Sequence, residues 1–286
     1  MTRSIQIVWL VLGVAFALLG GGGCAKDVPL RVMSYNIRTA TETDGPNKWA
    51  HRRDAMAAML SDRRPDVLGV QEARRGQIDD LMSRVDGYAW VGDGRDGGGQ
   101  GEFCPIFFDR RRFDLREHGT FWLSEQPETP SKGWDGAFPR IATWAKLRDK
   151  RAGREFVMLN THLDHRGEQA RVEGARLIVT RLDQLSNGLP IILTADLNAR
   201  PDSDVYRIMT DTLRDATRAR GAGHTGPAET YTGWIDRPRS TTRPTATMDY
   251  ILLSPSTGVR WTQTLPSDWG GRQLSDHRAV LADIDL

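Results

Sequence analysis

The chain has 286 residues, of which 39% are hydrophobic and 27% are charged. This is the composition of a soluble protein with a sizeable core, so a disordered chain is not expected. The formal net charge is only +2, and such balanced totals cannot establish nucleic-acid binding, which needs a clustered basic face.

Residues 1–24 differ sharply from the rest of the chain. Arg3 is followed by an apolar run at residues 5–19 and then by glycines up to Cys24. A basic start, a short apolar run and a small-residue exit are typical of an export signal, and the run is short for a membrane span. Cys24 after small residues resembles the lipobox of bacterial lipoproteins, in which that cysteine is lipidated. We expect export as a periplasmic or cell-surface lipoprotein. Simple cleavage to a secreted protein ranks second, and a retained anchor third.

The remainder, residues 28–286, is expected to form one domain. No repeat of fixed period and no long polar linker interrupts it, and the Gly-rich stretch 92–101 is interpreted as a loop within the domain. Only Cys104 remains in a mature lipoprotein, so no intrachain disulfide is expected. Cys104 lies in an apolar run, which predicts a buried and inert thiol.

Several strands and two helices are predicted in chain order. Apolar residues at helical spacing predict helices at 49–60 and 168–185. Runs of β-branched and aromatic residues predict strands at 30–37, 67–71, 103–109, 141–147, 156–161, 191–194, 248–253 and 279–284.

These elements favour an α/β fold, a two-sheet α/β sandwich with mixed sheets and outer helices. Several strands are apolar on successive residues, as in sheets that are covered on both faces. A doubly wound parallel sheet is the alternative. The strand pair within residues 103–123 resembles a hairpin and therefore favours mixed or antiparallel sheets.

Acidic, amide and imidazole side chains fall at the ends of these predicted strands. Singly, each is best explained as a turn former or an ordinary surface or core residue. Together they can converge at one end of the sheets, where oxygen ligands suit a hard cation such as Mg²⁺ or Mn²⁺. No Cys or His pair has the spacing of structural zinc. The residues concerned are Asn36, Glu72, His162, Asp196, Asn198, Asp249, Asp276 and His277.

The motifs SYNIR, QE, NTHLDH, TADLNARP, MDYILLS and LSDHRAV follow one another between Ser34 and Val280. In this order they resemble the endonuclease/exonuclease/phosphatase superfamily, which has the deoxyribonuclease I-like fold. The segments GTFWLSE, NTHLDH and ETYTGW are similar to a bacterial secreted or lipoprotein subgroup, closer to nocturnin-like enzymes than to pancreatic deoxyribonuclease. The resemblance implies a metal-dependent hydrolase of phosphate esters.

The resemblance also implies a metal site and a water-activating group. Glu72 is similar to the principal metal ligand, with Asn36 and Asp276 near the same cation. Asp196 is similar to the group that orients or deprotonates the attacking water. Asn198 is similar to the neighbour that holds the scissile phosphate.

Two oriented imidazoles are implied in the same way. His277 and His162 resemble the pair that contacts phosphate oxygens and manages protons, with Asp249 orienting His277 and Glu102 orienting His162. Arg140 resembles a phosphate-contacting arginine, and a surface salt bridge is the alternative. Asp164 and His165, just beyond His162, suit a role at the site rim or a structural role in the loop equally well.

One departure from the family pattern concerns the residues after Asn36. Ile37 and Arg38 follow it, where abasic-site endonucleases carry an acidic residue two positions beyond the asparagine. This disfavours an abasic-site endonuclease and leaves the expected metal site intact.

The substrate class is predicted only in outline, because fold does not select a substrate. A phosphodiesterase or nuclease, acting on a phosphodiester such as nucleic acid, is favoured. A phospholipid or inositol-phosphate phosphoesterase and a catalytically silent surface binding module are the alternatives. A monomer is expected. Specificity should lie in loops 92–101, 121–138 and 231–243, whose Trp122, Trp134 and Trp234 either stack on bases or pack the loops.

Overall fold

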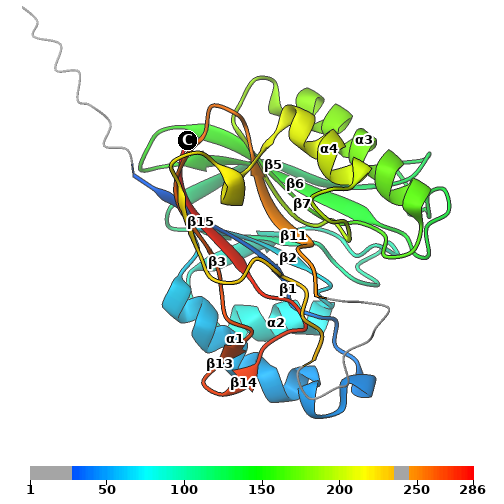
Figure 1. Ribbon diagram of the computed structural model, residues 1–286, viewed down its shortest axis with the longest axis vertical. Coiled ribbons are helices and arrows are strands. Elements are labelled where there is room, and N and C mark those ends of the chain that lie inside the picture. Colours follow the sequence, from blue (N-terminus) through cyan, green and yellow to red (C-terminus); the bar gives the residue numbers. More distant parts are fainter. Residues whose placement is uncertain (1–27, 235–244) are drawn as a thin grey trace, which may run out of the picture.

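Two β-sheets pack face to face, with helices on both outer surfaces (Figure 1). The computed structural model describes residues 28–234 and 245–286. The predicted two-sheet α/β sandwich is confirmed. The export signal and Cys24 lie outside the described residues. Among the helices that are described, none is long and apolar enough to cross a membrane.

The first sheet has the strand order β10-β12-β15-β1-β2-β4-β3. In it, β1 runs parallel to β2 and antiparallel to β15. Its strands are β1 (Leu30–Asn36), β2 (Val67–Gln71), β3 (Tyr88–Val91), β4 (Ile106–Asp109), β10 (Gly223–Thr225), β12 (Gly258–Thr264) and β15 (Val280–Asp285).

The second sheet has the order β5-β6-β7-β8-β11-β9. Here β7 runs parallel to β8, and β11 runs antiparallel to β8, so this sheet is also mixed. Its strands are β5 (Phe113–Trp122), β6 (Ile141–Asp149), β7 (Glu155–His162), β8 (Ile191–Asp196), β9 (Arg214–Asp215) and β11 (Asp249–Leu253). The short strands β13 (Asp268–Trp269) and β14 (Arg272–Gln273) pair separately.

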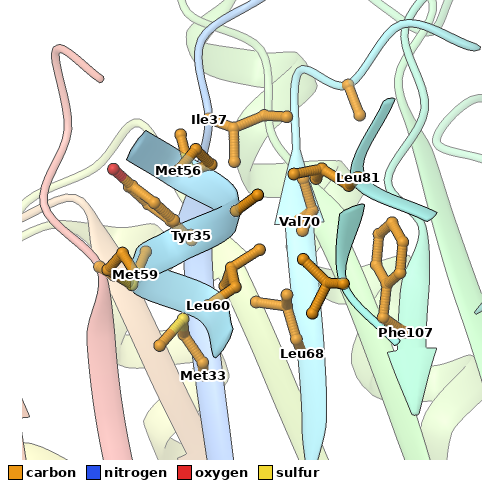
Figure 2. Close-up of a cluster of buried hydrophobic side chains, with 14 of the residues drawn as sticks. Met33, Tyr35, Ile37, Met56, Met59, Leu60, Leu68, Val70, Leu81 and Phe107 are labelled. Atoms are coloured by element: carbon orange, nitrogen blue, oxygen red, sulfur yellow. The ribbon is translucent and has the colours of Figure 1, made fainter. Parts of the chain in front are cut away.

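Each sheet is covered by two helices on its outer face. The helices α1 (Trp49–Arg63) and α2 (Arg75–Arg84) cover the first sheet, and α3 (Glu168–Ser186) and α4 (Asp204–Thr212) cover the second. Figure 2 shows how α1 packs on β1 and β2. Met56, Met59 and Leu60 of α1 pack against Met33 and Tyr35 of β1 and against Leu68 and Val70 of β2. Single helical turns lie at η1 (Glu42–Asn47) and η2 (Ala216–Arg218).

The predicted hairpin within residues 103–123 is wrong. The strand β4 pairs with β2 and β3, whereas β5 pairs with β6 in the other sheet. The turn after Asp109 therefore carries the chain between sheets, and the buried guanidinium of Arg112 holds it there by binding Asp149 and Asp66. The helices α2 and α4 and the strands β3 and β12 were not predicted; α2, α4 and β3 are short, with ten, nine and four residues.

The layer between the sheets changes from apolar to polar along the strands. Inward-facing residues of β7 are first Phe156 and Met158, then Asn160, and finally His162. The Asn160 amide donates to the backbone carbonyls of Val70 (2.7 Å) and Pro105 (3.0 Å) in the first sheet. Buried polar groups need such partners, and this network forms a base for the charged residues at the strand ends.

Candidate active site

A pocket of about 320 Å³ lies where the polar strand ends meet. Its walls include eight of the ten predicted site residues, and the other two, Asn36 and Asp249, contact residues of the wall. The eight are Glu72, Glu102, Arg140, His162, Asp196, Asn198, Asp276 and His277. Residues separated by more than 200 positions thus converge, as expected for side chains at the ends of neighbouring strands.

Asp196, the last residue of β8, lies at the centre of this set. Its Oδ2 accepts a hydrogen bond from the Asn36 amide at 2.9 Å, and its Oδ1 accepts one from the Asn198 backbone N–H at 2.9 Å. The same Oδ2 lies 3.5 Å from His162 Nε2 and 3.8 Å from His277 Nε2. The two predicted histidines therefore flank one buried carboxylate.

His277 and Asp249 form the predicted imidazole–carboxylate contact. Asp249 Oδ2 lies 2.8 Å from His277 Nδ1, and Asp249 Oδ1 is buried without a hydrogen-bond partner among the described residues. Burial lowers the pKa of His277, but Asp249 and Asp196 outweigh it and raise that pKa well above its usual value. Burial and the nearby Asp249 raise the pKa of Asp196 to about 7. The site thus holds a protonated imidazole beside a carboxyl that ionises near neutral pH.

The residues expected to hold a cation offer mostly oxygen ligands. Asn36 donates to Glu72 Oε1 at 3.0 Å, and Asp276 lines the same pocket. Burial opposes ionisation of Glu72, but Arg38 and the Thr39 N–H help to keep its pKa low. Burial and Glu72 raise the pKa of Asp276, so the two carboxyls repel each other. A hard divalent cation fits such a donor set, because it would relieve this repulsion.

Two compact groups of candidate metal ligands share Asp196. Glu72, His162 and Asp196 offer ligand atoms within 4.8 Å of one another, and so do Asp196, Asp249 and His277. Asp276 belongs to neither group, although it lines the pocket. Among the predicted acidic ligands, the compact groups therefore include Glu72 and leave out Asp276.

The prediction that Glu102 orients His162 is wrong. The Glu102 carboxylate pairs with Arg95, at 2.6 Å between Oε2 and Nη1. His162 Nε2 instead lies 2.9 Å from the Asn198 amide nitrogen. Burial and Arg140 lower the pKa of His162 well below its usual value, so its ring is neutral near pH 7. Sequence spacing could not reveal this, because Arg95 enters the pocket from the Gly-rich loop.

Arg140 lies in the pocket wall and is buried rather than part of a surface salt bridge. Its Nε lies 3.3 Å from Asp164 Oδ2, and its Nη2 lies 3.0 Å from His165 Nδ1. Asp164 also accepts backbone N–H groups, including those of Phe138 and Gly167. Asp164 thus has the structural role, whereas His165 is part of the pocket wall.

Three residues of the pocket wall have left-handed backbone conformations that non-glycine residues rarely adopt. Their φ angles are 58° at Arg38, 61° at Glu72 and 46° at Asn198. Such strain is retained where the surrounding structure fixes it, and it is concentrated at functional sites. Here it turns the side chains that follow β1, β2 and β8 into the pocket.

The pocket wall also contains residues that sequence analysis did not select. They are cationic or aromatic and come from loops, which the strand-end pattern does not cover: Arg38, Arg74, Arg95, Phe138 and Tyr231. Trp122 and Trp234 are buried and pack the body instead, with Trp122 Nε1 donating to the Arg95 carbonyl. Residues 235–243 of the third predicted specificity loop lie outside the described residues. Cys104 is buried, and burial raises the pKa of its thiol to about 12, as expected for an inert cysteine.

Comparison with solved structures gives two bacterial proteins of nearly the same size. An endonuclease/exonuclease/phosphatase from Bacteroides vulgatus is 32% identical, with a TM-score of 0.85, over 91% of this chain and 99% of that chain. A mannosyl-6-phosphatase from Bacteroides thetaiotaomicron VPI-5482 is also 32% identical, with a TM-score of 0.82, over 90% of this chain and 100% of that chain.

Sequence comparison finds more distant relatives that are longer. Human nocturnin is 26% identical over 260 residues, which cover 79% of this chain and 56% of nocturnin. The match to Drosophila melanogaster nocturnin is 25% identical and covers 62% of this chain and 30% of that protein. The chain therefore spans less than two thirds of these curated relatives.

Residues 33–277 match the model of the endonuclease/exonuclease/phosphatase family, and this span contains all ten predicted site residues. The match covers most of the chain, and the two mixed sheets agree with the fold of the structural neighbours. The chain belongs to the endonuclease/exonuclease/phosphatase family, whose members are hydrolases of phosphate esters.

Proposed function

We propose that this protein is a divalent-metal-dependent hydrolase of phosphate esters and that hydrolysis takes place around Asp196. One observation carries the proposal. The Asp196 carboxylate lies between two imidazoles, His162 at 3.5 Å and His277 at 3.8 Å, and the Asn36 amide joins it to Glu72. A carboxylate, two imidazoles and an oxygen-rich cation site are the groups that phosphate hydrolysis needs.

Each residue has a role that follows from its contacts. Glu72, Asn36 and Asp276 would hold the cation, which supplies Lewis-acid stabilisation of charge on phosphate oxygens when bound. Asp196, with a pKa near 7, can orient a water molecule and accept its proton. His277, kept protonated by Asp249, can donate to an oxygen of the phosphate.

The phosphate itself would be held by neutral and cationic donors. The Asn198 amide and the His162 ring lie side by side, 2.9 Å apart, and Arg140 lies in the same wall. Arginine presents donors that match phosphate oxygens, and its partner Asp164 fixes its orientation.

A small phosphate monoester is the substrate that we propose first. A volume of about 320 Å³ is at the lower end for ligand pockets, and arginines line its wall. The similarity to a mannosyl-6-phosphatase, at 32% identity over nearly the full chain, supports a phosphomonoester. The sequence-based prediction of a phosphodiesterase or nuclease stays a prediction, and the same assay tests it.

The assay compares hexose 6-phosphate, p-nitrophenyl phosphate, bis-p-nitrophenyl phosphate, single-stranded RNA and single-stranded DNA, each with Mg²⁺, Mn²⁺ or EDTA. We expect metal-dependent turnover that EDTA abolishes, with the monoesters ahead of the diesters. Glu72→Ala and His277→Ala should remove this activity, whereas Arg75→Ala, which changes an arginine outside the pocket wall, should retain it. Parental rates in folded Glu72→Ala and His277→Ala proteins would contradict the site assignment.

We further propose export and lipid anchoring through Cys24, as the pattern of residues 1–24 suggests. Fractionation of cells that express the parental chain should place it in the membrane fraction. Cys24→Ala should release it or leave an uncleaved precursor. A Cys24→Ala protein that is processed and still stays with the membrane would exclude this anchor.

A further inference from the structure

The pocket contains an exposed aromatic ring that the proposed hydrolysis does not use. Among the described residues, Phe138 is the large hydrophobic side chain that is exposed, with an exposed fraction of 46%. It lines the same pocket as Asp196 and His162. A single exposed apolar ring is common on protein surfaces, but this one lies in the wall of a polar pocket, where it is available for contact with a ligand.

Its neighbours hold Phe138 in place. Asp164 Oδ2 accepts the Phe138 N–H at 3.3 Å and also binds Arg140 at the same distance. The His165 ring stacks on it, with centroids 5.9 Å apart and planes inclined by 18°. One buried carboxylate therefore fixes both the backbone of Phe138 and the arginine of the phosphate wall, and the His165 ring packs on the Phe138 side chain. The ring keeps a defined position relative to a bound phosphate.

An ion pair, which is also outside the proposed hydrolysis, lies beside this ring. Arg95 Cζ is 4.7 Å from the Phe138 ring centroid, and Arg95 Nη1 is 2.6 Å from Glu102 Oε2. The two charged side chains are only 11% and 14% exposed. They line the pocket, and they also border Glu72 and His162 in an adjoining small void. The pair thus lies between the exposed ring and the catalytic carboxylates.

The chemistry of this ion pair suits a substrate that carries hydroxyl groups. A carboxylate only accepts hydrogen bonds, whereas a guanidinium only donates them, and a hydroxyl group does both. Arg95 Nη1 and Glu102 Oε2 bind each other, and both side chains line the pocket, so the pair offers a donor group and an acceptor group side by side. Adjacent hydroxyls can therefore bind Glu102 and Arg95 together, and such charge-assisted hydrogen bonds are the stronger ones.

We propose that Phe138, Arg95 and Glu102 form a subsite for a hydroxylated six-membered ring that carries the scissile phosphate. This inference rests on the proposed function. The C–H face of the ring packs on Phe138, and its hydroxyls bind the Arg95–Glu102 pair. A pyranose phosphate and an inositol phosphate share this chemistry. A nucleobase would use Phe138 without requiring Glu102.

The experiment measures discrimination between ring and open-chain esters by the full protein with Mg²⁺ or Mn²⁺. The substrates are hexose 6-phosphate, myo-inositol 1-phosphate, a nucleoside 5′-monophosphate and glycerol 3-phosphate. We expect kcat/KM to be at least about tenfold higher for a hydroxylated ring ester than for glycerol 3-phosphate. The better of the first two esters identifies the ring type.

Two pairs of variants assign the subsite. Phe138→Leu keeps an apolar side chain but removes the aromatic face, so it should lower the discrimination ratio about tenfold, mainly through KM. Phe138→Tyr keeps the face and should preserve the ratio. Glu102→Gln keeps the shape but weakens acceptance from hydroxyls and should also lower the ratio, whereas Glu102→Asp should restore part of it.

Binding separates this inference from the proposed function. Calorimetry in EDTA compares the affinities for hexose 6-phosphate, myo-inositol 1-phosphate and glycerol 3-phosphate without turnover. If no ester is hydrolysed but the ring preference and its loss in Phe138→Leu are seen, the proposed function fails and the subsite stands. If esters are hydrolysed and both Phe138→Leu and Glu102→Gln leave the ratio unchanged, the subsite is overturned. A preference for the nucleoside ester that is insensitive to Glu102→Gln also overturns it.

Discussion

Buried charged groups are paired with opposite charges at one end of the sandwich, whereas buried carboxyls lie close together at the other end. At the end where β1 and β2 begin, the Arg112 guanidinium binds Asp149 at 2.7 Å and Asp66 at 2.7 Å. Arg112 and Asp149 are each 2% exposed. At the other end, Asp249 Oδ1 has no hydrogen-bond partner within the part of the chain that the structure describes, and burial and Asp249 raise the pKa of Asp196 to about 7.

This difference identifies the end that has a function beyond stability. A buried charge that is paired with an opposite charge is compensated within the protein, as in the pairing of Arg112 with the equally buried Asp149. A buried excess of carboxyls lowers stability unless a cation or substrate compensates it. The carboxyl-rich end is therefore the one at which we propose that a ligand binds.

The largest expected effect comes from Asp196→Asn at the carboxyl-rich end. Removal of the charge that orients water should lower kcat roughly 10³-fold, within the range for loss of a general base. Stability should be unchanged or higher, because the repulsion with Asp249 is relieved. Steady-state kinetics and urea unfolding of the same preparation measure both quantities. A large loss of stability would show that the two ends do not differ as described.

At the opposite end, Arg112→Met should have the reverse pattern. Removal of the cation leaves Asp149 buried without its partner, and breaking a buried pair costs about 3–5 kcal/mol in the free energy of unfolding. The kcat per folded molecule should stay close to the parental value. Urea unfolding followed by circular dichroism, combined with kinetics at low temperature, tests this. A cost below about 1 kcal/mol would contradict the structural role of Arg112.

Metal binding should stabilise the protein through the carboxyl-rich end alone. Mn²⁺ at 100 times its Kd is expected to add about 2.7 kcal/mol to the free energy of unfolding. The Arg112→Met protein should gain the same increment, whereas Glu72→Ala should gain little. Thermal unfolding with graded Mn²⁺ and with EDTA provides the measurement. An equal gain in Glu72→Ala would place the cation elsewhere.

The smallest effect is expected from Asp283→Ala, in a more exposed pair near Arg112. Arg31 Nε and Nη2 bind the two oxygens of Asp283 at 2.8 and 2.9 Å, with side chains 39% and 21% exposed. Such pairs contribute about 0.2–1 kcal/mol. Chemical unfolding of Asp283→Ala and Arg112→Met in parallel would compare their losses in the free energy of unfolding. A smaller loss in Asp283→Ala would show that burial of the ion pair, rather than its geometry, determines the size of the loss. A loss equal to that of Arg112→Met would favour geometry.

The functional groups that follow or precede a buried strand could be predicted from the sequence. Asn36, His162 and Asp196 end strands whose apolar runs are easily recognised, and the two-residue period of a strand turns them to the inner face. The resemblance of the motifs to the family then suggested a role for each residue. This is why eight of the predicted residues line one pocket.

The errors arose where the path of the chain between elements decides the contact. Glu102 lies in the pocket as predicted, but its partner Arg95 comes from the Gly-rich loop, whose course no local pattern records. Likewise, β4 and β5 are close in sequence and resemble a hairpin, yet the Arg112 contacts hold them in different sheets. Phe138 lies in an irregular loop, where hydrophobic periodicity gives no information about exposure.

The hydrogen bonds of Asn160 determine how precisely the two sheets are aligned. Apolar contacts are non-directional and allow one sheet to slide on the other at little cost. Donation by Asn160 to the carbonyls of Val70 and Pro105 has a directional optimum and opposes such sliding. Gly69, where a Cβ would come within 1.9 Å of Thr194 Oγ1, allows the sheets to approach closely enough for these bonds. These bonds from the Asn160 side chain to backbone carbonyls thereby help to keep Glu72, which follows β2, aligned with Asp196 at the end of β8.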